Sequence, residues 1–111
     1  MLCIRGAVTA KNTIQDIGLQ STRLMAEIFS ANNLAPQQVS AVLFTVTKDL
    51  TVANPCTAVR KGFGMDNAAF MCMQEADIDG GLSGCIRVLV LGEGSGNGRF
   101  VYLDGAKNLR K

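Results

Sequence analysis

Three charged side chains stand in or next to apolar segments of this 111-residue sequence. Arg87 lies inside the apolar run 85–91, while Arg5 and Glu75 each follow an apolar run. Charges are rarely buried without a partner, so these three are expected to pair with one another or with a ligand. One glutamate cannot neutralise two arginines, and a guanidinium binds a carboxylate through two hydrogen bonds. An internal ion pair and an anion site, in which Glu75 accepts a hydroxyl hydrogen, both fit this pattern.

The sequence contains no histidine. This excludes Ser-His-Asp and Cys-His catalysis, histidine general bases and most transition-metal sites. The cysteines are widely spaced and form no CxxC motif, so we expect reduced thiols and no zinc site. They are Cys3, Cys56, Cys72 and Cys85. Any chemistry must therefore use arginine, lysine, carboxylates, tyrosine, cysteine or the backbone.

Two further candidates for site residues are ambiguous. Cys72 precedes Glu75 by three residues, so a regular strand would place the two side chains on opposite faces. A bend would be needed to bring both into one site, and core packing is the simpler interpretation for Cys72. Tyr102 is the only tyrosine, and it fits either a buried hydrogen-bond donor or a half-exposed strand residue.

The composition suggests contacts between subunits. Apolar residues make up 48% of the chain and charged residues only 18%, a low share for a small monomer. A net charge of +2 without a basic stripe does not indicate nucleic acid. No apolar run is long enough to cross a membrane, and no signal peptide is visible. We therefore expect no membrane association and a cytoplasmic location.

The hydrophobic pattern predicts one α+β domain over residues 1–111, with a mixed sheet packed on helices. A helix is expected to begin at Thr13, with Asp16 in a variant capping box, and a brief one at Asn54 and Pro55. The second strand is apolar on both faces and is expected to be covered on both sides. The glycine-rich segment 92–98 leads into a strand, so we interpret it as a connection and not a phosphate loop. Strands are expected at residues 2–9, 39–47, 68–74, 85–91 and 99–103.

An ordered set of short motifs resembles one enzyme family. The motifs are IRGA (4–7), PxxAVR (55–60), CMQE (72–75), GGL (80–82), CIRV (85–88) and VYL (101–103). Together they resemble the trimeric Bacillus-type chorismate mutases over residues 4 to about 110. The resemblance implies a pseudo-α/β-barrel homotrimer with three clefts at subunit boundaries. It also implies the cofactor-free pericyclic rearrangement of chorismate to prephenate.

The resemblance assigns roles to the misplaced charges. Arg87 is similar to the arginine that donates to the breaking ether oxygen and to a carboxylate. Arg5 resembles the arginine that binds a substrate carboxylate. Glu75 matches the group that accepts from the ring hydroxyl, with Cys72 beside it, and Tyr102 matches a tyrosine that donates to a carboxylate.

Further substrate-binding residues are also implied by the resemblance. Arg60 is similar to an arginine near the mouth of the cleft, and Arg110 to one in a mobile C-terminal tail. Thr57 and Met71 are expected to contact substrate as well. Thr57 stands where the family has a lysine, and Asn54 where better-known members have an aromatic residue. These departures keep two alternatives open: a non-catalytic chorismate-binding or regulatory trimer, and a trimer of the imine-deaminase type.

Overall fold

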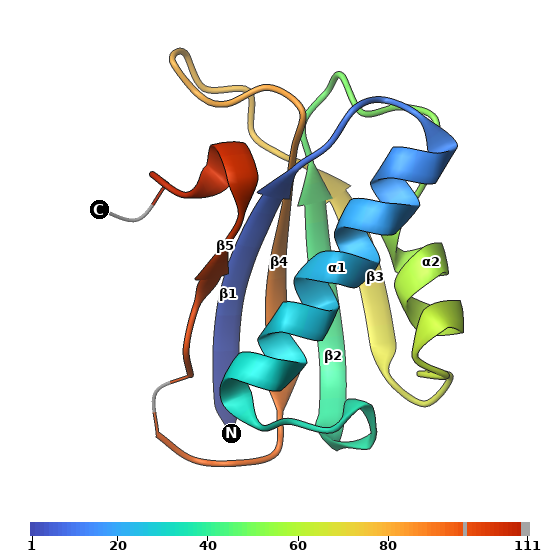
Figure 1. Cartoon of the computed structure of the whole chain (residues 1–111), viewed down its shortest axis with the longest axis vertical. Coiled ribbons are helices and arrows are strands. Elements are labelled where there is room, and N and C mark those ends of the chain that lie inside the picture. Colours follow the sequence, from blue (N-terminus) through green and yellow to red (C-terminus); the bar gives the residue numbers. More distant parts are fainter. Residues whose placement is uncertain (97, 110–111) are drawn as a thin grey trace.

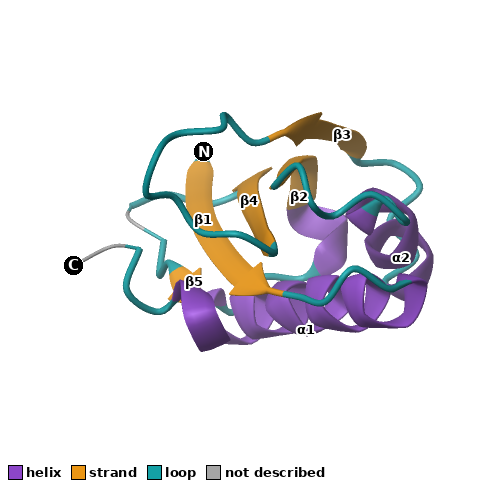
Figure 2. Ribbon diagram, turned by 90° about the horizontal axis from the view of Figure 1, so that it is seen from above, coloured by secondary structure: helices purple, strands orange, loops and turns teal. Residues whose placement is uncertain are grey.

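The structure is a computed structural model that describes residues 1–96 and 98–109. It contains one five-stranded sheet with two helices against one face (Figures 1 and 2). The strand order is β3-β2-β4-β1-β5; β4 runs antiparallel to β1 and β2, and the outer strands run parallel to their neighbours. This confirms the expected mixed sheet of the α+β class. The elements are β1 (Leu2–Thr9), α1 (Ile14–Asn32), η1 (Pro36–Gln38), β2 (Val39–Val46), α2 (Pro55–Gly62), β3 (Ala69–Gln74), β4 (Cys85–Gly92), β5 (Val101–Tyr102) and η2 (Asp104–Ala106).

Both helices begin at the expected caps. The Thr13 side chain accepts a hydrogen bond from the Asp16 backbone, and the Asn54 side chain accepts from Cys56 N ahead of Pro55. The Asp16 carboxylate accepts from Lys11 N at 2.7 Å, so it secures the segment that enters α1. No helix among the described residues has both the length and the apolarity that a membrane span requires.

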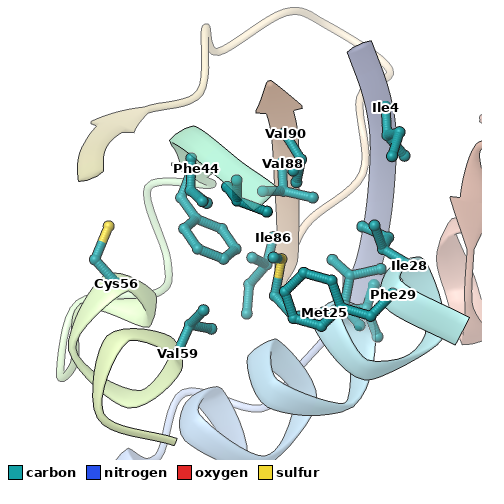
Figure 3. Close-up of a cluster of buried hydrophobic side chains, with 14 of the residues drawn as sticks. Ile4, Met25, Ile28, Phe29, Phe44, Cys56, Val59, Ile86, Val88 and Val90 are labelled. Atoms are coloured by element: carbon teal, nitrogen blue, oxygen red, sulfur yellow. The ribbon is translucent and has the colours of Figure 1, made fainter. Parts of the chain in front are cut away.

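The core lies between the sheet and the helices (Figure 3). Alternate residues of β4, Ile86, Val88 and Val90, point into it and are almost fully buried. The intervening residues Arg87 and Leu89 of β4 are only half-buried, because no helix in the described part of the chain covers the second face of the sheet (Figure 2). The expectation that the second strand is covered on both sides is wrong for this single chain. We call this second surface the open face.

The last strand is shorter than expected, since β5 comprises two residues instead of 99–103. Before β5, the backbone of Arg99 forms hydrogen bonds with the side chain of Asn32 and not with β1. After it, Leu103 N donates to Ala7 O, and η2 then begins at Asp104, whose φ of 52° lies in the left-handed region. Side-chain contacts from α1 thus replace ladder hydrogen bonds before β5, whereas Leu103 extends the pairing with β1 beyond it.

Candidate active site

A cleft of about 490 Å³ lies on the open face and receives side chains from all five strands or their ends. Register explains the convergence, because Arg87 of β4 pairs with Ala7 of β1 and Thr45 of β2, and Arg5 pairs with Leu89. These residues share one face by the two-residue strand period. The residues that line the cleft are Arg5, Gly6, Leu43, Thr45, Met73, Glu75, Arg87, Val88, Leu89 and Tyr102.

Glu75 is fixed at the end of β3. Its backbone N–H donates to Val46 O at 2.8 Å, which continues the β2–β3 pairing one residue beyond the strand. The hydroxyl of Thr45 donates to Oε1 of Glu75 at 2.5 Å. One carboxylate oxygen is therefore held by a neutral donor, and the other faces Arg87.

Arg87 is close to Glu75 but only weakly bound to it. The Nε atom of Arg87 lies 3.7 Å from Oε2 of Glu75, beyond hydrogen-bonding distance. This Nε is buried, and no hydrogen-bond partner for it exists among the described residues. A buried donor without a partner costs free energy unless a ligand or water satisfies it.

The cleft carries an excess of positive charge. Within the described residues Arg5 forms no ion pair, so the single carboxylate of Glu75 faces two guanidinium groups. Cys85 does not compensate for this excess, because burial raises the pKa of its thiol more than nearby Arg87 lowers it. The apolar side chains of Leu43, Met73 and Leu89 complete the walls. Such a site suits an anion with an apolar body.

Comparison with known proteins identifies the family. The family model "Chorismate mutase type I" matches residues 1–111. The chain belongs to this family. It is 39% identical to the chorismate mutase AroH of Bacillus subtilis (strain 168) over 78% of this chain and 69% of that protein. It is 37% identical to the chorismate mutase AroH of Thermus thermophilus over 96% of this chain and 91% of the relative.

A solved structure shows the same fold. The chorismate mutase from Clostridium thermocellum superposes on this chain with a TM-score of 0.89 at 38% sequence identity. The match covers 95% of this chain and 96% of the solved one. The resemblance that the sequence motifs suggested is therefore confirmed at the level of family and fold.

In this member of the family, four of the nine expected site residues line the cleft: Arg5, Glu75, Arg87 and Tyr102. Cys72 does not, because β3 is regular and turns Cys72 toward the core side of the sheet. There it contacts Cys56 of α2, and burial raises the pKa of both thiols, that of Cys56 to about 11. Within one chain Cys72 and Glu75 are thus on opposite faces.

Three other expected site residues also lie outside the cleft of the chain. Met71 is on the open face of the edge strand β3 and is 56% exposed. Thr57 and Arg60 are on α2, where Arg60 forms an ion pair with Asp66 at 3.3 Å. Arg110 lies outside the described residues.

Sequence reasoning missed several residues of the cleft. Thr45 binds Glu75. It is a polar residue in a strand that was expected to be buried on both sides, and this polarity was the signal that could have marked it as a site residue. Leu43 and Leu89 had no distinguishing signal, since apolar strand residues are common on either face. Among the described residues, no cluster of three or more His, Cys, Asp and Glu side chains is arranged to hold a metal ion.

Proposed function

We propose that this cleft is where the chain carries out the chorismate mutase reaction of its family. The observation that carries the proposal is the unpartnered Nε of Arg87, set between Glu75 and apolar walls with Arg5 nearby. The substrate of this reaction is a dicarboxylate, and two guanidinium groups against one carboxylate match its charge.

The reaction breaks a carbon–oxygen bond while a carbon–carbon bond forms within one molecule. It requires no nucleophile and no proton transfer, so the absence of histidine is no obstacle. We infer that Arg87 donates to the ether oxygen as negative charge develops there, and that this donor is oriented before the substrate arrives. Because no described residue accepts a hydrogen bond from Nε, little reorganisation accompanies the reaction.

The remaining polar groups select the reactive conformation. Arg5 and Tyr102 are positioned to bind the carboxylates, and the free oxygen of Glu75 is available to accept from the ring hydroxyl. Holding a compact conformer supplies part of the rate acceleration by orientation. The apolar walls exclude water and strengthen each polar contact.

We further propose a cytoplasmic homotrimer whose clefts are completed by a neighbouring subunit. Two features support it: the open face exposes apolar side chains, and Thr57, Arg60, Met71 and Cys72 lie outside the cleft of their own chain. A stable association would cover the exposed apolar surface of β3, where Met73 is 40% exposed. The same contact would bring α2 and β3 of one subunit toward the cleft of another.

The function is tested by following the loss of chorismate absorbance with the purified chain. We expect turnover without added metal or cofactor, and prephenate as the product. Chorismate binding without turnover would overturn catalysis and support a regulatory trimer instead. An absence of both binding and turnover would show that this cleft is not a chorismate site.

A further inference from the structure

Tyr102 lies in a segment that has little regular structure of its own to position it. β5 is two residues long and forms its register with β1 through Gly6–Val101 and Ala7–Tyr102. The connection that precedes β5 contains glycines at 94, 96 and 98, whose backbones are the least restricted of any residue type. The location of Tyr102 in the cleft therefore depends on contacts outside the strand.

One such contact lies three residues before Tyr102. The side-chain amide of Asn32, the last residue of α1, binds both backbone groups of Arg99: Arg99 N donates to Oδ1 at 2.6 Å, and Nδ2 donates to Arg99 O at 3.0 Å. The same Nδ2 donates to Ile28 O at 2.9 Å, which holds the amide against the helix. Asn32 thus replaces a neighbouring strand at this point.

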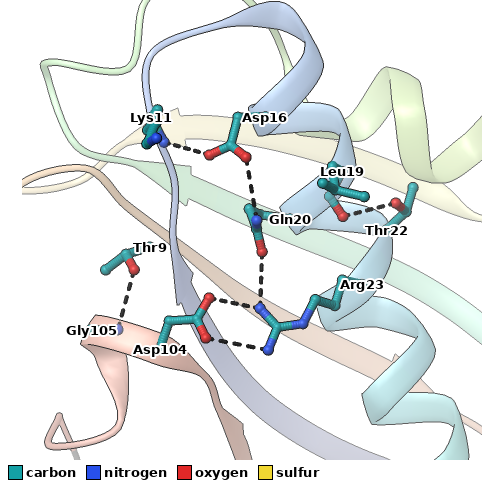
Figure 4. Close-up of polar contacts among 9 residues, drawn as sticks. All are labelled: Thr9, Lys11, Asp16, Leu19, Gln20, Thr22, Arg23, Asp104 and Gly105. Carbon is teal, nitrogen blue, oxygen red and sulfur yellow. Dashed lines mark hydrogen bonds and ion pairs between the residues drawn. The ribbon is translucent and has the colours of Figure 1, made fainter.

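A second contact lies two residues after Tyr102 (Figure 4). Arg23 of α1 binds the Asp104 carboxylate with both terminal nitrogens, Nη1 to Oδ2 at 2.6 Å and Nη2 to Oδ1 at 3.2 Å. Gln20 accepts from Nη1 at 3.0 Å and orients the guanidinium (Figure 4). The hydrogen bond with Arg23 lowers the pKa of Asp104, so the carboxylate stays ionised.

The second contact also supports the packing of the Tyr102 ring. Asp104 begins η2, whose Ala106 is completely buried and packs with Ala7 and Cys85. Tyr102 packs against this small cluster on the open face. The Asp104 contact and the hydrogen bond from Gly105 N to Oγ1 of Thr9 at 3.2 Å (Figure 4) together hold η2, and η2 supports one side of the ring.

We propose that Asn32 and Arg23 are positioning residues that hold Tyr102 in the cleft from both sides along the chain. The inference rests on the proposed function for the role of Tyr102 in substrate binding. Neither residue lines the cleft, so both act through Tyr102. The helix on the covered face of the sheet thereby controls a side chain on the open face.

The chain offers a direct probe, because Tyr102 is the only tyrosine and there is no tryptophan. Tyrosine fluorescence consequently reports on this residue alone. In Asn32→Ala and Arg23→Ala, we expect acrylamide quenching to increase and emission anisotropy to fall. The matched control is Lys48→Ala, which removes the exposed Lys48–Asp77 ion pair of 2.9 Å and should leave the fluorescence unchanged. Unchanged quenching and anisotropy in both α1 variants would overturn the proposal.

Kinetics give the second measurement. A loosened Tyr102 should weaken substrate binding, so KM should rise about three- to tenfold in each variant while kcat changes little. In a Tyr102→Phe background, adding Arg23→Ala or Asn32→Ala should have no further effect on KM. If either substitution raised KM in that background by the same factor as in the wild-type chain, the two residues would not act through Tyr102, and the proposal would be overturned.

Milder substitutions guard against variants that fail to fold. Arg23→Lys keeps the charge but loses the two-point contact, and Asn32→Asp keeps the acceptor for Arg99 N but loses the donor. Both should give intermediate quenching and KM. If Tyr102→Phe itself has a wild-type KM, the substrate-binding role of Tyr102 fails, while the fluorescence experiment still decides whether Asn32 and Arg23 position it.

Discussion

Arg87 and Glu75 face each other at 3.7 Å between Nε and Oε2, and the Nε has no hydrogen-bond partner in residues 1–96 and 98–109. Oε1 of Glu75 is bound instead by the neutral hydroxyl of Thr45. The pair consequently keeps a cationic donor available for a ligand. Donors fixed before the reaction are the most effective form of electrostatic stabilisation, so this geometry favours catalysis over a purely structural ion pair.

Arg87 should contribute mainly to the chemical step. For Arg87→Ala and Arg87→Lys we expect kcat to fall by about 10²–10³ or more, the cost typical of losing one such donor. KM should change less, because the contact strengthens as charge develops on the oxygen. Arg87→Lys keeps a charge but loses the planar fork, so it should remain severely impaired. Near wild-type turnover by an intact, folded Arg87→Ala variant would show that the central residue is assigned wrongly.

Glu75 should affect chorismate and simple anions in opposite directions. In Glu75→Gln the hydroxyl acceptor becomes neutral and weaker, so kcat/KM should fall about tenfold or more. The two arginines of the cleft then lack the one counter-charge that the described lining residues provide, so inorganic sulfate should become a stronger competitive inhibitor. Steady-state kinetics with a sulfate titration measures both effects. Weaker inhibition by sulfate would contradict the charge balance described for the cleft.

Cys72 should not act as a covalent nucleophile. Burial raises the pKa of its thiol, and the chain has no histidine to activate it. Cys72→Ser should therefore retain substantial activity, and iodoacetamide should modify the native protein slowly at pH 7. Mass spectrometry of a quenched reaction should find no adduct on this sulfur. A trapped substrate–Cys72 intermediate would refute the pericyclic mechanism.

The assembly can be measured directly. Light scattering should give three times the chain mass of 11.8 kDa, because the open face exposes apolar side chains that a partner would cover. Charged substitutions at Met71 and Met73 on the edge strand should weaken the association and the activity together. A stable monomer with full activity would disprove sites shared between subunits.

Stability should decrease in alkaline solution. Burial raises the pKa of Cys56 from 9.0 to about 11, so between these values the unfolded chain loses a proton that the folded chain keeps. The free energy of unfolding is thus unaffected by this group below pH 9 and falls as the pH rises toward 11. Denaturant unfolding at fixed protein concentration measures the slope, and Cys56→Ala should reduce it. An identical slope in the variant would contradict the burial of this thiol.

The five strands and the two α-helices were predictable from local sequence, whereas the short 3-10 helices η1 and η2 were not predicted. Strand alternation and the caps at Thr13 and Asn54 depend on neighbouring residues only, and the structure reproduces them. Arg5, Glu75 and Arg87 could be predicted as site residues because each is a charge in or next to an apolar segment, where the hydrophobic pattern predicts an apolar residue. Their meeting in one cleft was a hypothesis until the strand order was known.

Tertiary structure decided what depends on contacts between distant segments. The short β5 could not be predicted, because Asn32 binds Arg99 across 67 positions of sequence and removes it from the strand. Gly6 permits this edge to form, since a Cβ there would lie 2.9 Å from Val101 O. The strand period predicts that Cys72 and Glu75 lie on opposite faces, unless a bulge interrupts the strand. Only the structure shows that β3 has no bulge. Local sequence sets the direction of each side chain, whereas the packing of strands and helices decides which side chains meet.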